Sequence, residues 1–396
     1  SLSSSTVTNK VYAADLPAPA MNLYFKEGNA TAEAELSTLG MADGSVTLGQ
    51  LAPDALAKIG LDHNPATAEG SLLAVPWGAK APPGYSLHKR FDVSGSLKWE
   101  EKAPVIVPRW AFDGVEALDG KIYFVGGKDG AVRNIAERYD PATNQWESLT
   151  PMTEARDGMA AAVLNGKFYA IAGRTNNSVE IYDPQTEQWS LGPALPVPLY
   201  SAAAITINEK ILVIGGYNSG NLNLVYEYES ATNQWSQKAS MPTARYGHKL
   251  AFANGKVWAI GGSSAKTVEI YDVANDSWSS GPSLSKNRFH TIAWSANGII
   301  YVAGGSNDNT IEIYDPERNQ WVDAGFLPEK KYTSDATLLN GKVYLVSGHN
   351  SSAYSENVHA ADLTPPMDLY YREANASGTI TLDKLSTELT GEFANS

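Results

Sequence analysis

Short apolar runs that end in small residues recur along the chain at nearly constant spacing. Each run holds four apolar residues followed by Gly-Gly, Ala-Gly or Ser-Gly, and another apolar stretch with a turn precedes it, as in Ala160–Lys167. A continuous run of this length is typical of a strand buried on both faces, and the small pair allows a sharp turn where sheets crowd together. The runs and their small pairs are 122–127, 168–173, 211–216, 257–262, 300–305 and 343–348.

Tyrosine and tryptophan mark a second periodic feature between these runs. Five tryptophans are spaced 43 to 46 residues apart, and a tyrosine stands seven residues before each of them. The segment between the two, such as Asp140–Trp146, contains residues that favour turns, so each pair predicts a strand, a tight turn and a second strand. We interpret these aromatic side chains as filling the space between sheets. The pairs are Tyr139 and Trp146, Tyr182 and Trp189, Tyr228 and Trp235, Tyr271 and Trp278, and Tyr314 and Trp321.

Combined, the two patterns predict a repeated four-stranded antiparallel sheet. One such sheet cannot bury both faces alone, and radial repetition buries each sheet against its neighbours. The order Gly-Gly, Tyr-Asp and Trp resembles the kelch-repeat family across roughly residues 85–350. The resemblance implies an all-β, six-bladed β-propeller of four-stranded antiparallel blades.

Counting half-blades predicts how the ring closes. Six inner halves are present but only five outer halves follow in line, and the sixth lies upstream in Ser86–Asp92 and Leu97–Glu101, which contains Trp99. We expect these N-terminal strands to pair with the C-terminal inner half near Val343–Gly348 and so remove the exposed sheet edges. Residues 354–373 are the alternative source of outer strands.

The sequence divides into three segments: a flanking segment 1–84, the propeller 85–350, and a tail 351–396 that could supply blade-closing strands. The chain ends repeat each other, because Val11–Leu16 and Met21–Lys26 match Val358–Leu363 and Met367–Arg372 at offsets of 347 and 346 residues. Two explanations are open. The chain is one unit of a longer tandem protein, which we favour, or the ends exchange strands between subunits.

The flanking segments do not follow the repeat. Leu48–Ile59, with Pro53 near its start, predicts a short helix, and Leu382–Leu389 predicts a short helix or linker. Gly70–Tyr85 resembles the tail-collar modules of phage surface fibres. This resemblance implies a secreted or cell-surface protein of bacterial or phage-like type.

Composition excludes several functions. The formal net charge of −13 argues against bulk attraction to nucleic acid or anionic membranes, and no apolar run is long enough to insert into a membrane as a helix. The chain has no cysteine, which removes disulfides and thiolate metal sites. We predict no metal site and no cofactor.

The candidate binding residues lie in two sets of loops that kelch propellers place on one face. These are the loops that precede each inner strand, called here the leading loops, and the loops that follow each small pair, called the glycine loops. Five of the six leading loops carry a cation and five carry an aromatic residue. Arginine binds carboxylates and sulfates, and aromatic rings cover sugar or peptide surfaces. The predicted ligand-binding residues are Arg109, Trp110, Arg156, Arg174, Tyr200, Tyr217, Arg245, Tyr246, His248, Arg288, Phe289, His290, Lys331, Tyr332 and His349.

We therefore expect a non-catalytic recognition module that binds an acidic glycan or an acidic protein segment. A structural role for the arginines, tying blades together through backbone carbonyls, is the alternative for each of them. Enzymes with kelch propellers offer a second function. The copper site of galactose oxidases needs a cysteine that is missing here, but a mutarotase-like or lyase-like acid–base pair for acidic sugars could combine His248 or His290 with Asp157 or Asp308. A third possible function is that of a structural unit in a surface fibre, assembled through the homologous chain ends.

Overall fold

The computed structural model describes residues 97–363, except 111–113, 175, 264, 297, 307, 317, 331–332 and 351–352, and the backbone of six strands outside that range. The chain forms two compact units, one with residues 97–313 and 323–363 and one with the remainder. The predicted segments 48–59 and 382–389 and the candidate residues Lys331 and Tyr332 lie outside the described residues.

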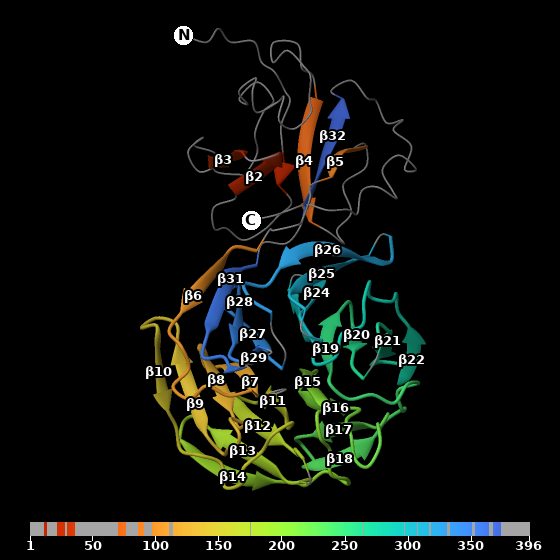
Figure 1. Cartoon of the computed structure of the whole chain (residues 1–396). Helices are drawn as coiled ribbons and strands as arrows, with labels where there is room; N and C mark the ends of the chain where they lie inside the picture. The colour runs from red at the N-terminus through yellow and green to blue at the C-terminus, as the bar shows by residue number, and fades with distance from the viewer. Residues whose placement is uncertain are drawn as a thin grey trace. The chain divides into compact units, whose positions relative to one another are not determined.

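The larger unit is a ring of six four-stranded antiparallel sheets, which confirms the predicted fold class (Figure 1). The first strand of each sheet lies innermost and contacts the first strands of the two neighbouring sheets. The blades are β7 (Val115–Leu118), β8 (Lys121–Val125), β9 (Ala136–Asp140), β10 (Gln145–Ser148); β11 (Ala160–Leu164), β12 (Lys167–Ile171), β13 (Val179–Asp183), β14 (Gln188–Gly192); β15 (Ala203–Ile207), β16 (Lys210–Ile214), β17 (Val225–Glu229), β18 (Gln234–Gln237); β19 (His248–Ala253), β20 (Lys256–Gly261), β21 (Val268–Asp272), β22 (Ser277–Ser280); β23 (Ile292–Ala296), β24 (Ile299–Ala303), β25 (Thr310–Asp315), β26 (Gln320–Phe326); and β27 (Asp335–Leu339), β28 (Lys342–Val346), β31 (Val358–Asp362), β6 (Trp99–Lys102).

The sixth blade closes the ring with one N-terminal strand and three C-terminal strands. The Trp99 strand β6 is its outermost strand, as predicted, and pairs with β31. The prediction that Ser86–Asp92 supplies the third strand is wrong, because β31 pairs with β28 and takes that place. Val358, Ala360 and Ala361 of β31 are fully buried. The alternative source of strands thus provides the third strand, and it lacks the tyrosine that marks this strand in the other five blades.

The other unit contains a four-stranded sheet in the order β1 (Tyr12–Ala13), β4 (Gly70–Pro76), β32 (Met367–Glu373) and β5 (Ser86–Arg90). A separate hairpin joins β2 (Asn22–Glu27) to β3 (Ala30–Glu35).

In the larger unit, a short hairpin of β29 (His349–Asn350) and β30 (Ala353–Tyr354) follows the inner half of the sixth blade. Among the residues that the structure describes, no helix is long and apolar enough to cross a lipid bilayer.

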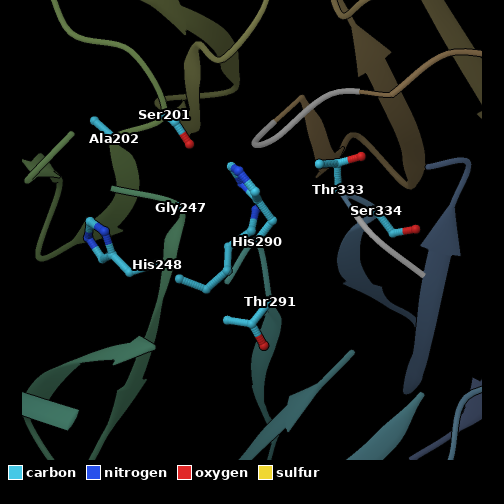
Figure 2. Close-up of a pocket in the computed structure, with 9 residues that line it drawn as sticks. Ser201, Ala202, Gly247, His248, His290, Thr291, Thr333 and Ser334 are labelled. Atoms are coloured by element: carbon cyan, nitrogen blue, oxygen red, sulfur yellow. The ribbon is translucent and has the colours of Figure 1, made fainter. Parts of the chain in front are cut away.

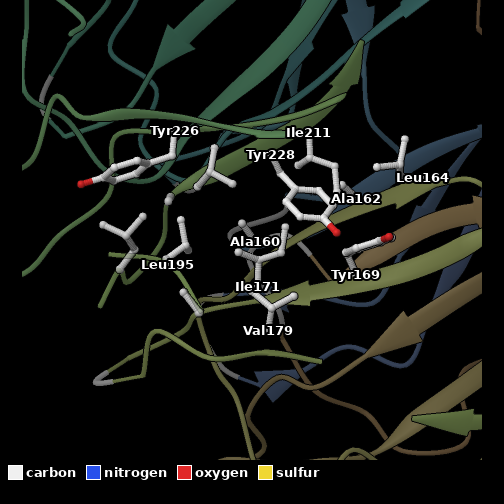
Figure 3. Packing of buried hydrophobic residues seen from close by; sticks show 14 residues of the cluster. Ala160, Ala162, Leu164, Tyr169, Ile171, Val179, Leu195, Ile211, Tyr226 and Tyr228 are labelled. Atoms are coloured by element: carbon white, nitrogen blue, oxygen red, sulfur yellow. The ribbon is translucent and has the colours of Figure 1, made fainter. Parts of the chain in front are cut away.

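The aromatic repeat fills the space between blades, as predicted. Figure 3 shows Tyr169 of the second blade and Tyr228 of the third within one apolar cluster, and their ring centroids are 5.8 Å apart. The outer-strand tryptophans also link blades, because their indole N–H groups donate to carbonyls of the preceding chain segment, as Trp146 does to Ala103 at 2.9 Å and Trp278 to Ala239 at 2.8 Å. Burial of large aromatic rings with a satisfied polar tip stabilises each interface.

The glycine pairs link successive blades through the backbone. The amides of Gly127, Gly216 and Gly262 donate to the carbonyls of Arg156, Arg245 and Arg288 in the next blade, at 2.8 to 2.9 Å. These glycines have positive φ angles. A Cβ atom on the preceding glycines, Gly126, Gly215 and Gly261, would lie 2.6 to 2.8 Å from the same carbonyls. Close approach and backbone conformation therefore both favour glycine at these three positions, although Ala172 and Ser347 occupy the equivalent position in the second and sixth blades with positive φ angles.

Candidate binding face

The leading loops and the glycine loops lie side by side, as predicted. Trp110 and Lys128 exchange backbone hydrogen bonds, and so do Tyr200 and Tyr217. The amide of Ser263 donates to the carbonyl of Tyr246 at 2.9 Å in the same way. Each of these blades therefore presents both loops together on one face of the ring, which we call the loop face.

Four arginines of the leading loops point into the blades. Arg109, Arg156, Arg245 and Arg288 are at most 1% exposed. Each forms an ion pair with a glutamate on the third strand of its own blade. The N–O distances are 3.0 Å for Arg109–Glu137 and Arg156–Glu180 and 2.8 Å for Arg245–Glu269 and Arg288–Glu312.

Other donors of these arginines bind backbone carbonyls of the same blade. Arg288 Nη1 donates to the carbonyls of Gly304 and Thr310 at 2.7 and 3.1 Å. The carboxylate of Glu312 accepts the amide of Ser285 at 2.9 Å, which holds the leading loop to the blade. Burial raises the pKa of Glu137 in the first blade, while Arg109 opposes that rise. Each pair neutralises its two charges within the protein, although Glu137 Oε2 and Arg245 Nε have no hydrogen-bond partner among the described residues.

The third blade shows what replaces this ion pair. Leu199 occupies the arginine position and Tyr226 the glutamate position, and both belong to the same buried apolar cluster. Both charges have thus been replaced together, so neither is left buried without its partner. This joint replacement supports a structural role for the arginine–glutamate pairs.

The prediction that Arg109, Arg156, Arg245 and Arg288 present cations to a ligand is therefore wrong. Their side chains are buried, and their charges are neutralised within the blade. Sequence alone could not separate the two roles, because the glutamate lies 24 to 28 residues away on another strand. The structure shows a structural role instead, but within each blade: the side chains bind carbonyls of their own blade, as Arg288 binds those of Gly304 and Thr310, and do not tie neighbouring blades together.

Most of the candidate side chains that are not buried on the loop face are aromatic. Tyr217, Tyr246 and Phe289 form a continuous row from the third to the fifth blade, with ring centroids 5.4 and 5.1 Å apart. Tyr200 adjoins the row through its backbone pairing with Tyr217. Tyr217 is 41% exposed and the other three are half-buried. We call these four residues the aromatic row.

The other described candidate residues on this face lie on the second, first and sixth blades. Arg174 lies over the ring of Tyr200 at 5.5 Å, and its half-exposed guanidinium binds both oxygens of the buried Asp157 at 2.8 and 2.6 Å. Lys128 lies 6.0 Å from the ring of Trp110 in the first blade. His349 contacts Tyr354 in the sixth blade, with ring centroids 5.5 Å apart.

Neither His248 nor His290 is paired with Asp157 or Asp308, the carboxylates predicted as acid–base partners, among the described residues. Burial lowers the pKa of both His248 and His290 to about 3, so both are neutral at physiological pH. Asp157 is bound to Arg174. Burial would raise the pKa of Asp308, but its hydrogen bond to Lys286 and others lower it overall. The pairs predicted for acid–base catalysis are therefore not formed.

A narrow mouth leads from the loop face toward the channel of the ring. Figure 2 shows His290 between Ser201 and Thr333 at this mouth. These three residues adopt positive φ angles of 53°, 53° and 59°, and the amides of Ser201, Gly247 and His290 donate in sequence to carbonyls of the preceding leading loops, beginning at Gly158. The remaining space is about 10 Å³, enough for roughly one water molecule.

An ion pair that the sequence did not reveal lies inside the ring. Lys249 Nζ is 2.7 Å from Asp335 Oδ1, linking the fourth blade to the sixth. Asp335 also accepts the amide of Val115 in the first blade at 3.1 Å. Lys249 lines both the mouth and a channel space of about 260 Å³. The sequence feature that could have revealed this ion pair is a charged residue, Lys249 or Asp335, at a position near the start of an inner strand where the second and third blades have alanine.

The buried histidines predict a specific loss of stability in acid. A histidine with a pKa of about 3 in the folded protein and about 6.5 in the unfolded chain stabilises the fold above pH 6.5, and that contribution is lost as the pH falls toward 3. At pH 4.5 the loss is roughly 2 to 3 kcal/mol per histidine. Met159 occupies the position of His248 in the second blade. We expect the His248→Met variant, measured by urea unfolding, to lose less stability than the wild type when the pH falls from 7 to 4.5, and the difference should be about this amount. A variant with the same pH dependence as the wild type would contradict the assignment.

Comparisons with known proteins agree with this fold. A family model described as the KLHDC2/KLHL20/DRC7 Kelch-repeats domain matches residues 113–304, and a Kelch motif model matches residues 295–325. The chain belongs to the kelch-repeat family, and its propeller is of the class that serves as a protein-recognition module.

Individual relatives match over short stretches. Kelch-like protein 28 from Homo sapiens is 38% identical over 84 residues, 19% of this chain and 14% of that protein. The F-box/kelch-repeat protein At5g26960 from Arabidopsis thaliana is 38% identical over 73 residues, 18% of this chain and 17% of that protein. The matches thus span less than a fifth of each relative. A solved structure titled "Structure of YjhT" shares the fold, with a TM-score of 0.56 and 16% identity over 69% of this chain and 96% of that chain.

Proposed function

We propose that this propeller recognises a polypeptide segment through the aromatic row of its loop face. The observation that carries this proposal is the row itself, in which Tyr217, Tyr246 and Phe289 form one surface across three blades. Aromatic rings supply large contact area at low cost in conformational entropy, and they are enriched where binding energy concentrates. Loops on a rigid scaffold are also where binding sites are commonly found.

The mouth supports binding across the face rather than catalysis within the ring. Its space of about 10 Å³ does not admit a sugar ring or a side chain without rearrangement. A ligand would therefore lie over the loops. Arg174 lies over the Tyr200 ring but is already paired with Asp157, and Lys128 lies on the first blade beside Trp110. A preference for acidic ligands would therefore rest on these two cations and not on the buried arginines. The secreted or cell-surface location stays a prediction, which rests on the resemblance of Gly70–Tyr85 to tail-collar modules.

Peptide selection tests the proposal. A random peptide library displayed on phage would be selected against the full chain, and the dissociation constant of the selected peptide would be measured for the wild type and for Tyr217→Ser with Tyr246→Ser. We expect affinity to fall about 30-fold, equivalent to about 2 kcal/mol, since both rings belong to the contact surface. Leu191→Ser is the matched control, because Leu191 is 77% exposed on outer strand β14.

Two outcomes would overturn this proposal. Equal affinity of the loop-face variant and the wild type would place the peptide elsewhere. Failure of every peptide selection, together with retention of acidic glycans on an array, would replace the peptide with an anionic sugar as the ligand class.

A further inference from the structure

The two chain ends have similar sequences, and the structure shows which strand the C-terminal copy forms. Val358–Asp362 forms β31, which lies between β28 and β6 as the third strand of the sixth blade. The N-terminal copy, Val11–Asp15, has the sequence Val-Tyr-Ala-Ala-Asp where β31 has Val-His-Ala-Ala-Asp. Two segments of one chain therefore carry nearly the same sequence for a single strand position.

The residues shared by the two copies are those that the blade uses. Val358, Ala360 and Ala361 are fully buried, and the N-terminal copy has the same residue types at 11, 13 and 14. Asp362, also shared, forms an ion pair with Lys342 at 2.7 Å. The one position that differs, His359, is only half-buried. A segment that preserves every buried side chain of a strand meets the packing requirements of the same position.

The match is specific to the closing blade. The third strands of the other five blades place a tyrosine directly before the acidic residue, as in Tyr139–Asp140, whereas β31 and the N-terminal copy both have alanine there. Ala361 stands opposite Trp99 of β6, whereas the equivalent tryptophans of the first four blades, such as Trp146, stand opposite a tyrosine. The N-terminal copy is thus a duplicate of the closing strand and not of a general kelch strand.

The duplication continues into the next strand. Asn22–Glu27 (β2) matches the C-terminal six residues of β32, after a connection one residue longer than that between β31 and β32. In the structure β32 pairs with both β4 and β5, while β2 pairs with β3 and Tyr12–Ala13 pairs in parallel with β4. The N-terminal copy therefore reproduces two successive strands without occupying either of their positions.

We propose that Val11–Asp15 is a donor strand for the closing blade of a second copy of this propeller, where it takes the position of β31 between β28 and β6. The partner is defined by the chemistry of that position: the backbones of β28 and β6, which pair with β31 in the structure and would pair with the donor once it displaces β31, apolar surface beside Trp99, and Lys342 for the terminal aspartate. The interaction does not involve the loop face, so it stands or falls independently of the proposed recognition function.

The test weakens the resident strand in the full chain. Ala360→Glu with Ala361→Glu places two carboxylates in buried positions and opens the position to the donor. We expect this acceptor variant to remain folded and to self-associate in sedimentation experiments. Adding Ala13→Glu and Ala14→Glu should abolish association and lower the melting temperature by roughly 5 °C or more. The control, Ala13→Glu with Ala14→Glu in the otherwise unmodified chain, should melt like the wild type.

Two results would overturn the inference. Equal melting temperatures and equal masses for the two-substitution and four-substitution variants, including the case in which neither folds, would show that the N-terminal copy does not supply the strand. A monomeric acceptor variant whose stability still depends on Ala13 and Ala14 would show that the segment fills the position in its own chain. The proposed exchange with a second copy would then be wrong.

Discussion

Arg288→Leu is expected to lower the free energy of unfolding by about 3 to 5 kcal/mol, because it leaves Glu312 buried without its partner. The guanidinium of Arg288 is fully buried, and it binds the Glu312 carboxylate as well as two backbone carbonyls of the same blade. The loss therefore combines an unpaired charge with unsatisfied acceptors. Urea denaturation at pH 7 measures it.

The third blade provides the matched control for this substitution. Arg288→Leu with Glu312→Tyr recreates the Leu199 and Tyr226 combination found there. We expect this double variant to be more stable than either single variant, since no buried charge is left unpaired. Additive losses in the double variant would contradict the assignment of the ion pair as the structural element.

Asp335→Ala is expected to cost a similar amount, about 3 to 5 kcal/mol. Lys249 would lose its carboxylate partner inside the ring, and the amide of Val115 would lose its acceptor. Because this ion pair joins the fourth, sixth and first blades, we expect the loss to appear as lower cooperativity of urea unfolding as well as a lower midpoint.

The equivalent positions in the second and third blades again define the control. Ala160 and Ala203 stand there, so Lys249→Ala with Asp335→Ala should recover part of the stability lost in Asp335→Ala. A double variant less stable than Asp335→Ala would show that Lys249 stabilises the ring through contacts other than this carboxylate.

The sequence predicted the ring well because its signals are repeated. Each blade carries an apolar run that ends in a small pair, together with a tryptophan, and five of the six also carry the tyrosine, so the imperfect copies support one another. The closing blade was predicted only in part. Its third strand, β31, has Ala361 where the other blades have tyrosine, and the partner Trp99 lies more than 250 residues away in the chain. A strand without its marker residue cannot be distinguished by pattern from a linker.

The candidate site was harder to predict, because one residue type serves two roles. An arginine in a loop next to a strand has the same sequence signal whether its side chain is buried in the blade, as that of the leading-loop residue Arg288 is, or stays partly exposed, as that of the glycine-loop residue Arg174 does. The difference depends on a glutamate on another strand, which becomes a neighbour only after folding. The aromatic residues Tyr217 and Tyr246 were predicted for the loop face and lie there, but their contact across two blades depends on the ring geometry.

We expect the aromatic row, and not the buried arginines or the opposite face, to form the recognition surface. Hydrogen–deuterium exchange of the full chain, with and without a peptide selected against it, tests this most directly. We predict protection of the backbone amides at 199–201, 217–221, 245–247 and 288–290. Protection confined to the turns of the opposite face, such as Asn165–Lys167 and Asn208–Lys210, would contradict it.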